Sequence, residues 1–213
     1  MSHELRTPLT VIKGYIETLQ SLMPESDERL VKSLGSMDVQ TARMESLISD
    51  LLWLSRIESV EGERKDDQLD LVDLLSHVCD ELMAAWPGRQ IELVTSSKLC
   101  VLGNAAELRS AISNLIDNAL SYGRPPVLLQ LRREGGQLLL AVQDQGEGIA
   151  QAARPEALMP FHRLDASRGG SGHCGLGLAI AARVAEAHGG RLELRDPRGG
   201  GFSVCLLLPL LGS

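Results

Sequence analysis

The chain has 213 residues, of which 44% are hydrophobic, and a formal net charge of −7 at pH 7. This length is enough for one large domain or two small ones with a real core, and the acidic balance argues against nucleic acid as the main partner. The four cysteines form no C-x-x-C pair, no signal peptide is visible, and no apolar run approaches the ~20 residues of a membrane span, so the sequence predicts reduced thiols in a soluble cytoplasmic chain.

Reactive and polar side chains crowd the start of the chain, in the stretch SHELRTPLT at residues 2–10. In a helix, His3 and Thr7 lie on one face because residues four apart are neighbours there. A neutral imidazole with an ordinary pKa of about 6.5 is a competent nucleophile near neutral pH, and the adjacent Glu4 carboxylate can take up its ring proton. Pro8 lacks an N–H and predicts a kink beside the histidine. The stretch therefore predicts a nucleophilic histidine assisted by a carboxylate.

Apolar residues that repeat at threes and fours predict two helices in the N-terminal part, one over residues 4–23 and one that runs to about residue 60. Residues 24–27 (PESD) form the break between them. The second helix carries an apolar stripe close to a heptad rhythm, made of Leu30, Leu34, Met37, Thr41, Met44, Ile48, Leu51 and Ile57. Two amphipathic helices joined by a short turn cannot bury both stripes alone, so we predict a dimeric four-helix bundle.

A charged segment without apolar residues, EGERKDDQ at 61–68, predicts a domain boundary. We expect a helical domain over 1–61, a linker over 62–68 and a second domain over 69–213. Periodicity and turn residues in this second domain predict helices from Leu71 (capped by Asp70), from the Asn104 capping box to Gly123, and over 176–188, with strands over 90–95, 99–102, 127–133, 137–144, 191–195 and 202–208. The chain is therefore predicted to be an α+β protein, with a helical hairpin followed by a two-layer α/β sandwich.

Two polar motifs in the second domain suit a nucleotide. Asn114 and Asn118 lie one helical turn apart, opposite the apolar stripe, where amide oxygens can serve a Mg²⁺–phosphate unit. Asp144 ends a predicted strand and is followed by Gly146 and Gly148. A carboxylate there can accept the exocyclic amine of adenine, while the glycines let the backbone fold close to the base.

A third motif, GHCGLGL at residues 172–178, runs directly into a predicted helix. Glycines before a helix N-terminus let backbone N–H groups and the helix dipole meet phosphate. Gly175 and Gly177 are the candidates for this contact, with Leu176 between them.

In this order and spacing, the three motifs resemble the N-box and the two glycine boxes of histidine-kinase catalytic domains. Residues 160–163 (PFHR) resemble the phenylalanine box, and residues 2–10 resemble the H-box. The chain is thus similar to the cytoplasmic core of a bacterial two-component sensor histidine kinase. The resemblance implies a Bergerat-type ATP-binding sandwich after a dimerising hairpin, with ATP and Mg²⁺ as cofactors.

The resemblance implies that His3 accepts the γ-phosphoryl group of ATP with Glu4 as base, and then passes it to an aspartate of a response regulator receiver domain. Thr7 matches the position that orients water when such a kinase dephosphorylates its regulator. In this family the first helix continues upstream into a sensor that usually spans the inner membrane. The chain would then be a cytoplasmic portion that meets the membrane only through an upstream segment.

The resemblance also implies roles at the ATP site. Asn118 resembles the Mg²⁺ ligand, with Asn114 in support. Asp144 resembles the residue that reads adenine, in a pocket shaped by Gly146 and Gly148. The remaining roles are Tyr122 beside the base or ribose, Arg163 on phosphate, and Gly175, Leu176 and Gly177 at the end of a mobile lid over 151–174.

Two departures from the family pattern keep other classes of protein open. His173 stands where the first glycine of the second glycine box is usual, and Ser121 stands where a lysine or arginine is frequent near the phosphates. Arg124 is the candidate to replace that cation. An ATP-binding pseudokinase that only dimerises and docks is the first alternative. A gyrase- or chaperone-type ATPase is disfavoured, because those families place a glutamate base where Asn114 stands and lack an H-box.

Overall fold

The computed structural model describes residues 10, 12–19, 30–41, 44, 48, 51, 67–95, 99–162 and 175–211. These residues belong to two compact units, the first formed by the N-terminal helices and the second by the residues from 67 onward. The predicted site residues His3, Glu4, Thr7 and Arg163 lie outside the described residues.

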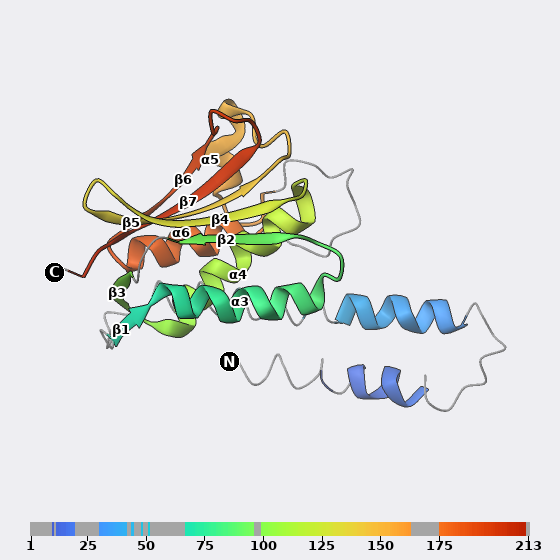
Figure 1. The fold of residues 1–213 in the computed structure, drawn as a ribbon. Coiled ribbons are helices and arrows are strands. Elements are labelled where there is room, and N and C mark those ends of the chain that lie inside the picture. The colour runs from blue at the N-terminus through green and yellow to red at the C-terminus, as the bar shows by residue number, and fades with distance from the viewer. Residues whose placement is uncertain are drawn as a thin grey trace. The chain divides into compact units, whose positions relative to one another are not determined.

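The described residues of the first unit are helical, as the 3.6-residue periodicity predicts (Figure 1, blue). The heptad stripe separates into two rows with different environments. Leu34 and Thr41 are about 5% exposed, and the Thr41 hydroxyl donates to the Met37 carbonyl at 2.9 Å. The other row consists of Met37, Met44 and Leu51. Their side chains are 55%, 52% and 45% exposed, respectively. A single copy of the unit therefore buries one row and leaves the other on its surface.

The second unit is a five-stranded mixed sheet in the order β2-β4-β5-β7-β6, with a separate β1–β3 pair. Figure 1 shows α3, α4 and α6 against one face of the sheet. The bounds of the strands are β1 Asp67–Asp70, β2 Ile91–Thr95, β3 Cys100–Gly103, β4 Val127–Glu134, β5 Gln137–Asp144, β6 Arg191–Arg195 and β7 Phe202–Pro209. The bounds of the helices are α3 Leu71–Ala85, α4 Ala105–Tyr122, a 3₁₀ turn η1 Gln151–Ala153, α5 Arg154–Ala157 and α6 Gly177–Ala187. The predicted two-layer sandwich is confirmed.

The starts of helices α3 and α4 agree with the capping residues that the sequence predicts. The Asp70 side chain accepts from Val72 N at 3.0 Å and begins α3. Asn104 begins α4 in the same way, accepting from Ala106 N and Glu107 N at 3.0 and 3.1 Å. In a capping box the Glu107 side chain would accept from the Asn104 N–H. In the structure this N–H donates instead to Nε2 of His188 at 3.1 Å. A histidine from the end of α6 thus completes the cap of α4.

The first strand of the unit was not anticipated. β1 pairs antiparallel with β3, and Asp67 and Gln68 stand opposite Gly103 and Leu102. The strand therefore begins two residues inside the segment 62–68 that the charge run marks as a linker. Its polar residues carry no alternating apolar pattern, so only the distant partner strand defines it.

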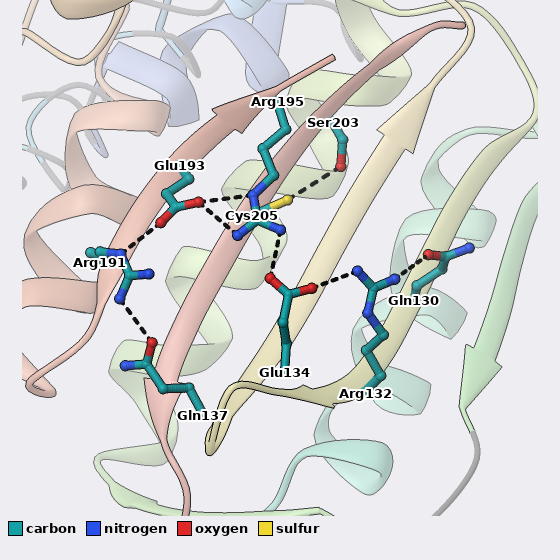
Figure 2. Close-up of polar contacts among 9 residues, drawn as sticks. All are labelled: Gln130, Arg132, Glu134, Gln137, Arg191, Glu193, Arg195, Ser203 and Cys205. Atoms are coloured by element: carbon teal, nitrogen blue, oxygen red, sulfur yellow. Dashed lines mark hydrogen bonds and ion pairs between the residues drawn. The ribbon is translucent and has the colours of Figure 1, made fainter. Parts of the chain in front are cut away.

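The other face of the sheet carries a second buried cluster under a layer of charged side chains. Leu139, Ala141, Cys205 and Leu207 are at most 5% exposed and stand opposite one another in the β5–β7 register. Figure 2 shows long polar side chains of β4, β5 and β6 around Cys205, and the strand register places Arg132 opposite Leu139 and Gln130 opposite Ala141. The Arg195 guanidinium on β6 pairs with the Glu134 carboxylate on β4 at 2.8 Å. This ion pair crosses over β5 and β7, the two strands between them.

Candidate functional site

Asn114, from the paired-asparagine motif on α4, lies next to Gly177, from the glycine motif at the start of α6. The buried stripe of α4 faces the core and leaves Asn114 and Asn118 half-buried on an adjoining face. Asn114 Nδ2 donates to Ser110 O at 3.0 Å, which directs the amide oxygen away from the helix backbone. A Cβ atom on Gly177 would lie 3.0 Å from that oxygen. Residues 63 positions apart in the sequence therefore place an amide oxygen beside the first residue of α6.

The N-terminus of α6 has the features of an anion site. Its N-cap residue, Leu176, makes no side-chain cap hydrogen bond, and the first-turn N–H groups of a helix have no partner within the helix. The partial positive charge of the helix dipole adds to these donors. Leu176 itself is 1% exposed, so its side chain is packed in the core at the start of the helix.

Asp144, the second motif, is a buried carboxyl group at the end of β5. It is 8% exposed, and its Oδ1 accepts from Gly146 N at 2.6 Å. Burial raises the pKa of the Asp144 carboxyl, while hydrogen bonds from the backbone N–H groups of Gly146 and Arg124 oppose that rise. A carboxylate with one oxygen held by the backbone can use its other oxygen to accept from a ligand amine.

Glycines surround Asp144 where any side chain would collide with it. A Cβ atom on Gly123 would lie 2.4 Å from Asp144 Cγ, and one on Gly146 would lie 2.6 Å from Oδ1. Gly123 caps α4 as predicted, but its φ of −80° is not left-handed, so the need for glycine there comes from Asp144. Gly201 was missed, and a Cβ atom on it would lie 2.1 Å from the Asp144 carbonyl oxygen.

Gly148 has two independent reasons to be glycine. Its φ is +69°, and a Cβ atom would lie 2.5 Å from the ring of Phe202. Phe202 stands opposite Asp144 in the β5–β7 register and is 4% exposed. The aspartate, its glycine turn and the start of β7 therefore form one packed unit.

The segment 151–174, predicted to be a lid, begins with regular structure rather than with an irregular loop. Residues 151–157 form η1 and α5, and the next described residues lead to Phe161 and His162. Phe161 N donates to Gly175 O at 3.1 Å, and a Cβ atom on Gly175 would lie 2.7 Å from His162 O. Gly175 has a φ of +72°, and Phe161, 57% exposed, has a φ of +66°. Phe161 and His162 thus lie directly against Gly175.

The residues near the end of α4 differ in their surroundings. Tyr122 is half-buried in the last position of the helix. Arg124 forms an exposed ion pair with Glu147, at 3.2 Å, and so points to the glycine turn after Asp144. The Ser121 hydroxyl oxygen is buried and has no hydrogen-bond partner among the described groups. Whether Arg124 replaces the cation expected at position 121 stays a prediction, and in the structure its guanidinium pairs with Glu147.

This fold and this site define the class of histidine kinase-, DNA gyrase B- and HSP90-like ATPases. The model of that family matches residues 103–212, and the model of the His Kinase A (phospho-acceptor) domain matches residues 1–60. The chain is 38% identical over 210 residues to the phosphate regulon sensor protein PhoR of Pseudomonas aeruginosa, covering 94% of this chain and 46% of that protein. It is 33% identical over 213 residues to the sensor-type histidine kinase PrrB of Mycobacterium tuberculosis, covering 98% and 46%.

Solved structures agree with this assignment. Full-length ShkA in complex with AMPPNP superposes with a TM-score of 0.80 at 28% identity, over 100% of this chain and 45% of that one. The ATP-binding domain of PrrB from Mycobacterium tuberculosis superposes with a TM-score of 0.57 at 28% identity, over 68% and 97%. The chain belongs to the sensor histidine kinase family. It spans less than half of the length of the two curated relatives above, and none of its described helices is long and apolar enough to cross a membrane.

Proposed function

We propose that the chain is the ATP-dependent kinase core of a two-component sensor. His3 accepts the γ-phosphoryl group of ATP, with Glu4 taking up the ring proton, and then passes it to an aspartate of a response regulator receiver domain. Thr7 orients water in the reverse, phosphatase reaction. The observation that supports this proposal best is the buried Asp144 among its glycines, in a chain whose first 60 residues match the phospho-acceptor domain.

Asp144 binds the base end of ATP. One of its carboxylate oxygens accepts a hydrogen bond from the exocyclic amine of adenine, and Gly146 and Gly148 let the ring approach the backbone. Tyr122, at the end of α4, packs beside the base or ribose. The support for this arrangement is the buried Asp144 carboxyl group, around which Gly123 and Gly146 pack so closely that a methyl group on either would collide with it.

Asn118 binds the phosphate end through Mg²⁺, with Asn114 in support. The N-terminus of α6, through Gly175, Leu176 and Gly177, receives the phosphates, and Arg163 contacts them. The donor chemistry fits Mg²⁺, which takes oxygen ligands and keeps several from phosphate and water. Among the described residues no group of three or more His, Cys, Asp and Glu side chains is placed to hold a metal ion.

The first unit dimerises. The row Met37, Met44 and Leu51 repeats every seven residues and is half-exposed in one copy, although it belongs to an apolar stripe. A second hairpin would bury this row in a four-helix bundle. We propose a helical domain over 1–61 and a second domain that begins with β1 at residue 67, two residues before the limit of 69 expected from the sequence. We also propose a cytoplasmic position behind an upstream membrane segment.

The test is a labelling assay with γ-labelled ATP and Mg²⁺ on the wild type, His3→Gln, Asn118→Ala and His77→Gln. His77 is an exposed histidine on α3 and serves as the matched control. We expect an acid-labile, base-stable label on the wild type and His77→Gln, and none on the other two.

Each contrary outcome points to another class of protein. Label that persists in His3→Gln overturns the assignment of the acceptor. Tight nucleotide binding without any label supports the pseudokinase, which the serine at position 121 and the engaged Arg124 favour. Steady release of phosphate without a phosphoenzyme supports an ATPase.

A further inference from the structure

We propose that Arg154 is a positioning residue that fixes the glycine turn beside Asp144 and so sets the shape of the base pocket. Arg154 lies outside all the motifs named in the sequence. The inference rests on the proposed function, because it assumes that adenine binds at Asp144.

The guanidinium group of Arg154 joins two segments that are far apart in the chain. Its Nε donates to Ile149 O at 3.0 Å, in the residue directly after the glycine turn. Its Nη1 donates to Leu194 O at 3.1 Å, and its Nη2 pairs with Asp196 Oδ1 at 2.5 Å. Leu194 and Asp196 lie at the end of β6 and just beyond it. One rigid fork of donors therefore ties the turn to the β6–β7 hairpin.

The Arg154 guanidinium also contacts the aromatic ring of Phe202, which packs against Gly148 in the glycine turn. The guanidinium carbon lies 5.5 Å from the centroid of the Phe202 ring, a distance at which a cation is attracted by an aromatic face. Phe202 in turn packs on Gly148, where a Cβ atom would come within 2.5 Å of the ring. Arg154 thus holds the turn through Ile149 and supports the ring against which Gly148 rests.

The burial of this arginine makes the contacts effective. The Arg154 side chain is 17% exposed, so its bonds to the two carbonyl oxygens are partly shielded from water. Removing the guanidinium would leave these half-buried carbonyls without their donor and the Phe202 ring without its neighbour. A lysine cannot replace it, since a single ammonium cannot reach three acceptors in a planar fork. The predicted consequence is a turn that samples positions in which the base no longer fits.

The experiment uses the intact chain and the variant Arg154→Met, which keeps the apolar stem. We measure the Kd for ADP and for GDP, and the labelling rate as a function of ATP concentration. We expect the Kd for ADP and the KM for ATP to rise by roughly tenfold and the preference for ADP over GDP to shrink, with kcat within about twofold of the wild type. Asp196→Asn, which weakens only the ion pair, should shift the same quantities by about threefold.

The control is Arg109→Met, which removes an arginine–glutamate pair between α4 and α3. It should leave the Kd and the ADP preference unchanged. A loss of kcat with an unchanged KM, or an unchanged ADP preference in a folded Arg154→Met protein, overturns the inference. If Arg154→Met does not fold, a wild-type ADP preference in Asp196→Asn overturns it instead. A wild-type chain that binds no nucleotide refutes the proposed function itself, and the first titration reveals this.

Discussion

Asp144 is a carboxyl group whose surroundings oppose its charge. It is 8% exposed, and burial raises the pKa of its carboxyl against two backbone hydrogen bonds. A buried charge without an ionic partner lowers the stability of a fold, and such groups cluster at functional sites. We infer that the domain tolerates this residue because adenine recognition requires an acceptor there.

The first prediction concerns Asp144→Asn. Because the folded-state pKa is raised, the folded protein holds its proton more tightly than the unfolded chain, and wild-type stability falls as pH rises through that pKa. The amide should therefore raise the free energy of unfolding by roughly 0.5–2 kcal/mol at mildly alkaline pH. The gain should fade as pH falls and the wild-type carboxyl is protonated. ADP binding should be lost, because the amide presents a donor to the adenine amine.

Urea unfolding at two pH values and calorimetric titration with ADP measure both effects. A variant less stable than the wild type at alkaline pH would show that the hydrogen bonds from Gly146 and Arg124 outweigh the burial of the charge. Retained ADP binding would move the base pocket away from Asp144.

The second prediction compares Gly148→Ala with Gly88→Ala. Both glycines have positive φ, +69° and +86°, so both alanines carry a backbone cost of roughly 1–2 kcal/mol. Only at Gly148 does the new methyl group also meet Phe202, since Gly88 has nothing within 4 Å. Gly148→Ala should weaken ADP binding at least about tenfold, and Gly88→Ala should leave it unchanged. Equal effects of the two alanines on ADP affinity would mean that backbone strain alone is responsible.

At the scale of elements, the sheet is covered by helices on one face and by an ion-pair network on the other. Hydrogen bonds from Arg132 and Arg195 lower the pKa of Glu134. At Glu193 burial acts to raise the pKa, but hydrogen bonds from Arg195 and Arg191 lower it overall. Carboxyls with lowered folded-state pKa values stabilise the protein above their ordinary pKa and lose that contribution as pH falls.

The third prediction follows for Arg195→Met, in which an apolar side chain still covers Cys205. Near neutral pH the variant should lose about 1 kcal/mol of unfolding free energy, because both glutamates are about one-third exposed and keep their other arginine partners. The difference from the wild type should shrink in acid, where Glu134 and Glu193 are protonated in both proteins. Urea unfolding across the acidic range measures it.

Arg183→Met is the control for this series. Arg183 pairs with Glu186 within α6 at 3.2 Å, and both side chains are more than half exposed. Arg183→Met should lower the free energy of unfolding by less than about 0.5 kcal/mol. A difference between Arg195→Met and the wild type that stays constant into strong acid would assign the effect to packing rather than charge.

At the scale of the whole molecule, the first unit has a surface that a single copy does not bury. The fourth prediction is that Met44→Glu converts the dimer to a monomer, because a carboxylate in the apolar row must be desolvated in the bundle. Val39→Glu is the matched control, since Val39 is 61% exposed on the same helix but lies off the row. Sedimentation velocity measures the mass of each protein. A dimer that survives Met44→Glu would place the dimer interface elsewhere.

Sequence patterns predicted the elements of the second unit well because their signals are local. The Asn104 cap, the apolar periodicity of α4 and the glycine turn of the β4–β5 hairpin each act within a few residues. The glycine boxes were found for the same reason, as short motifs at the ends of strands and helices.

The features that sequence reasoning missed depend on partners far away in the chain. His188 completes the cap of Asn104 across 84 positions, and Arg154 reaches Asp196 across 42. Phe202 and Gly201 gain their roles only because β7 lies next to β5. The roles of all the site residues stay predictions, and His3, Glu4, Thr7 and Arg163 also lie outside the described part of the chain.

The sequence by itself determined the order of the elements, the family and the residue types of the site, since helix caps, hairpin turns and short motifs are encoded by near neighbours. Only the tertiary structure decided which residues hold that site in shape. It brought Asn114 against Gly177, enclosed Asp144 between Gly123 and Gly201, and tied the glycine turn to β6 through Arg154. The physical reason is that close contact, burial and shielded hydrogen bonds arise from packing between distant segments, and no local pattern encodes which segments will meet.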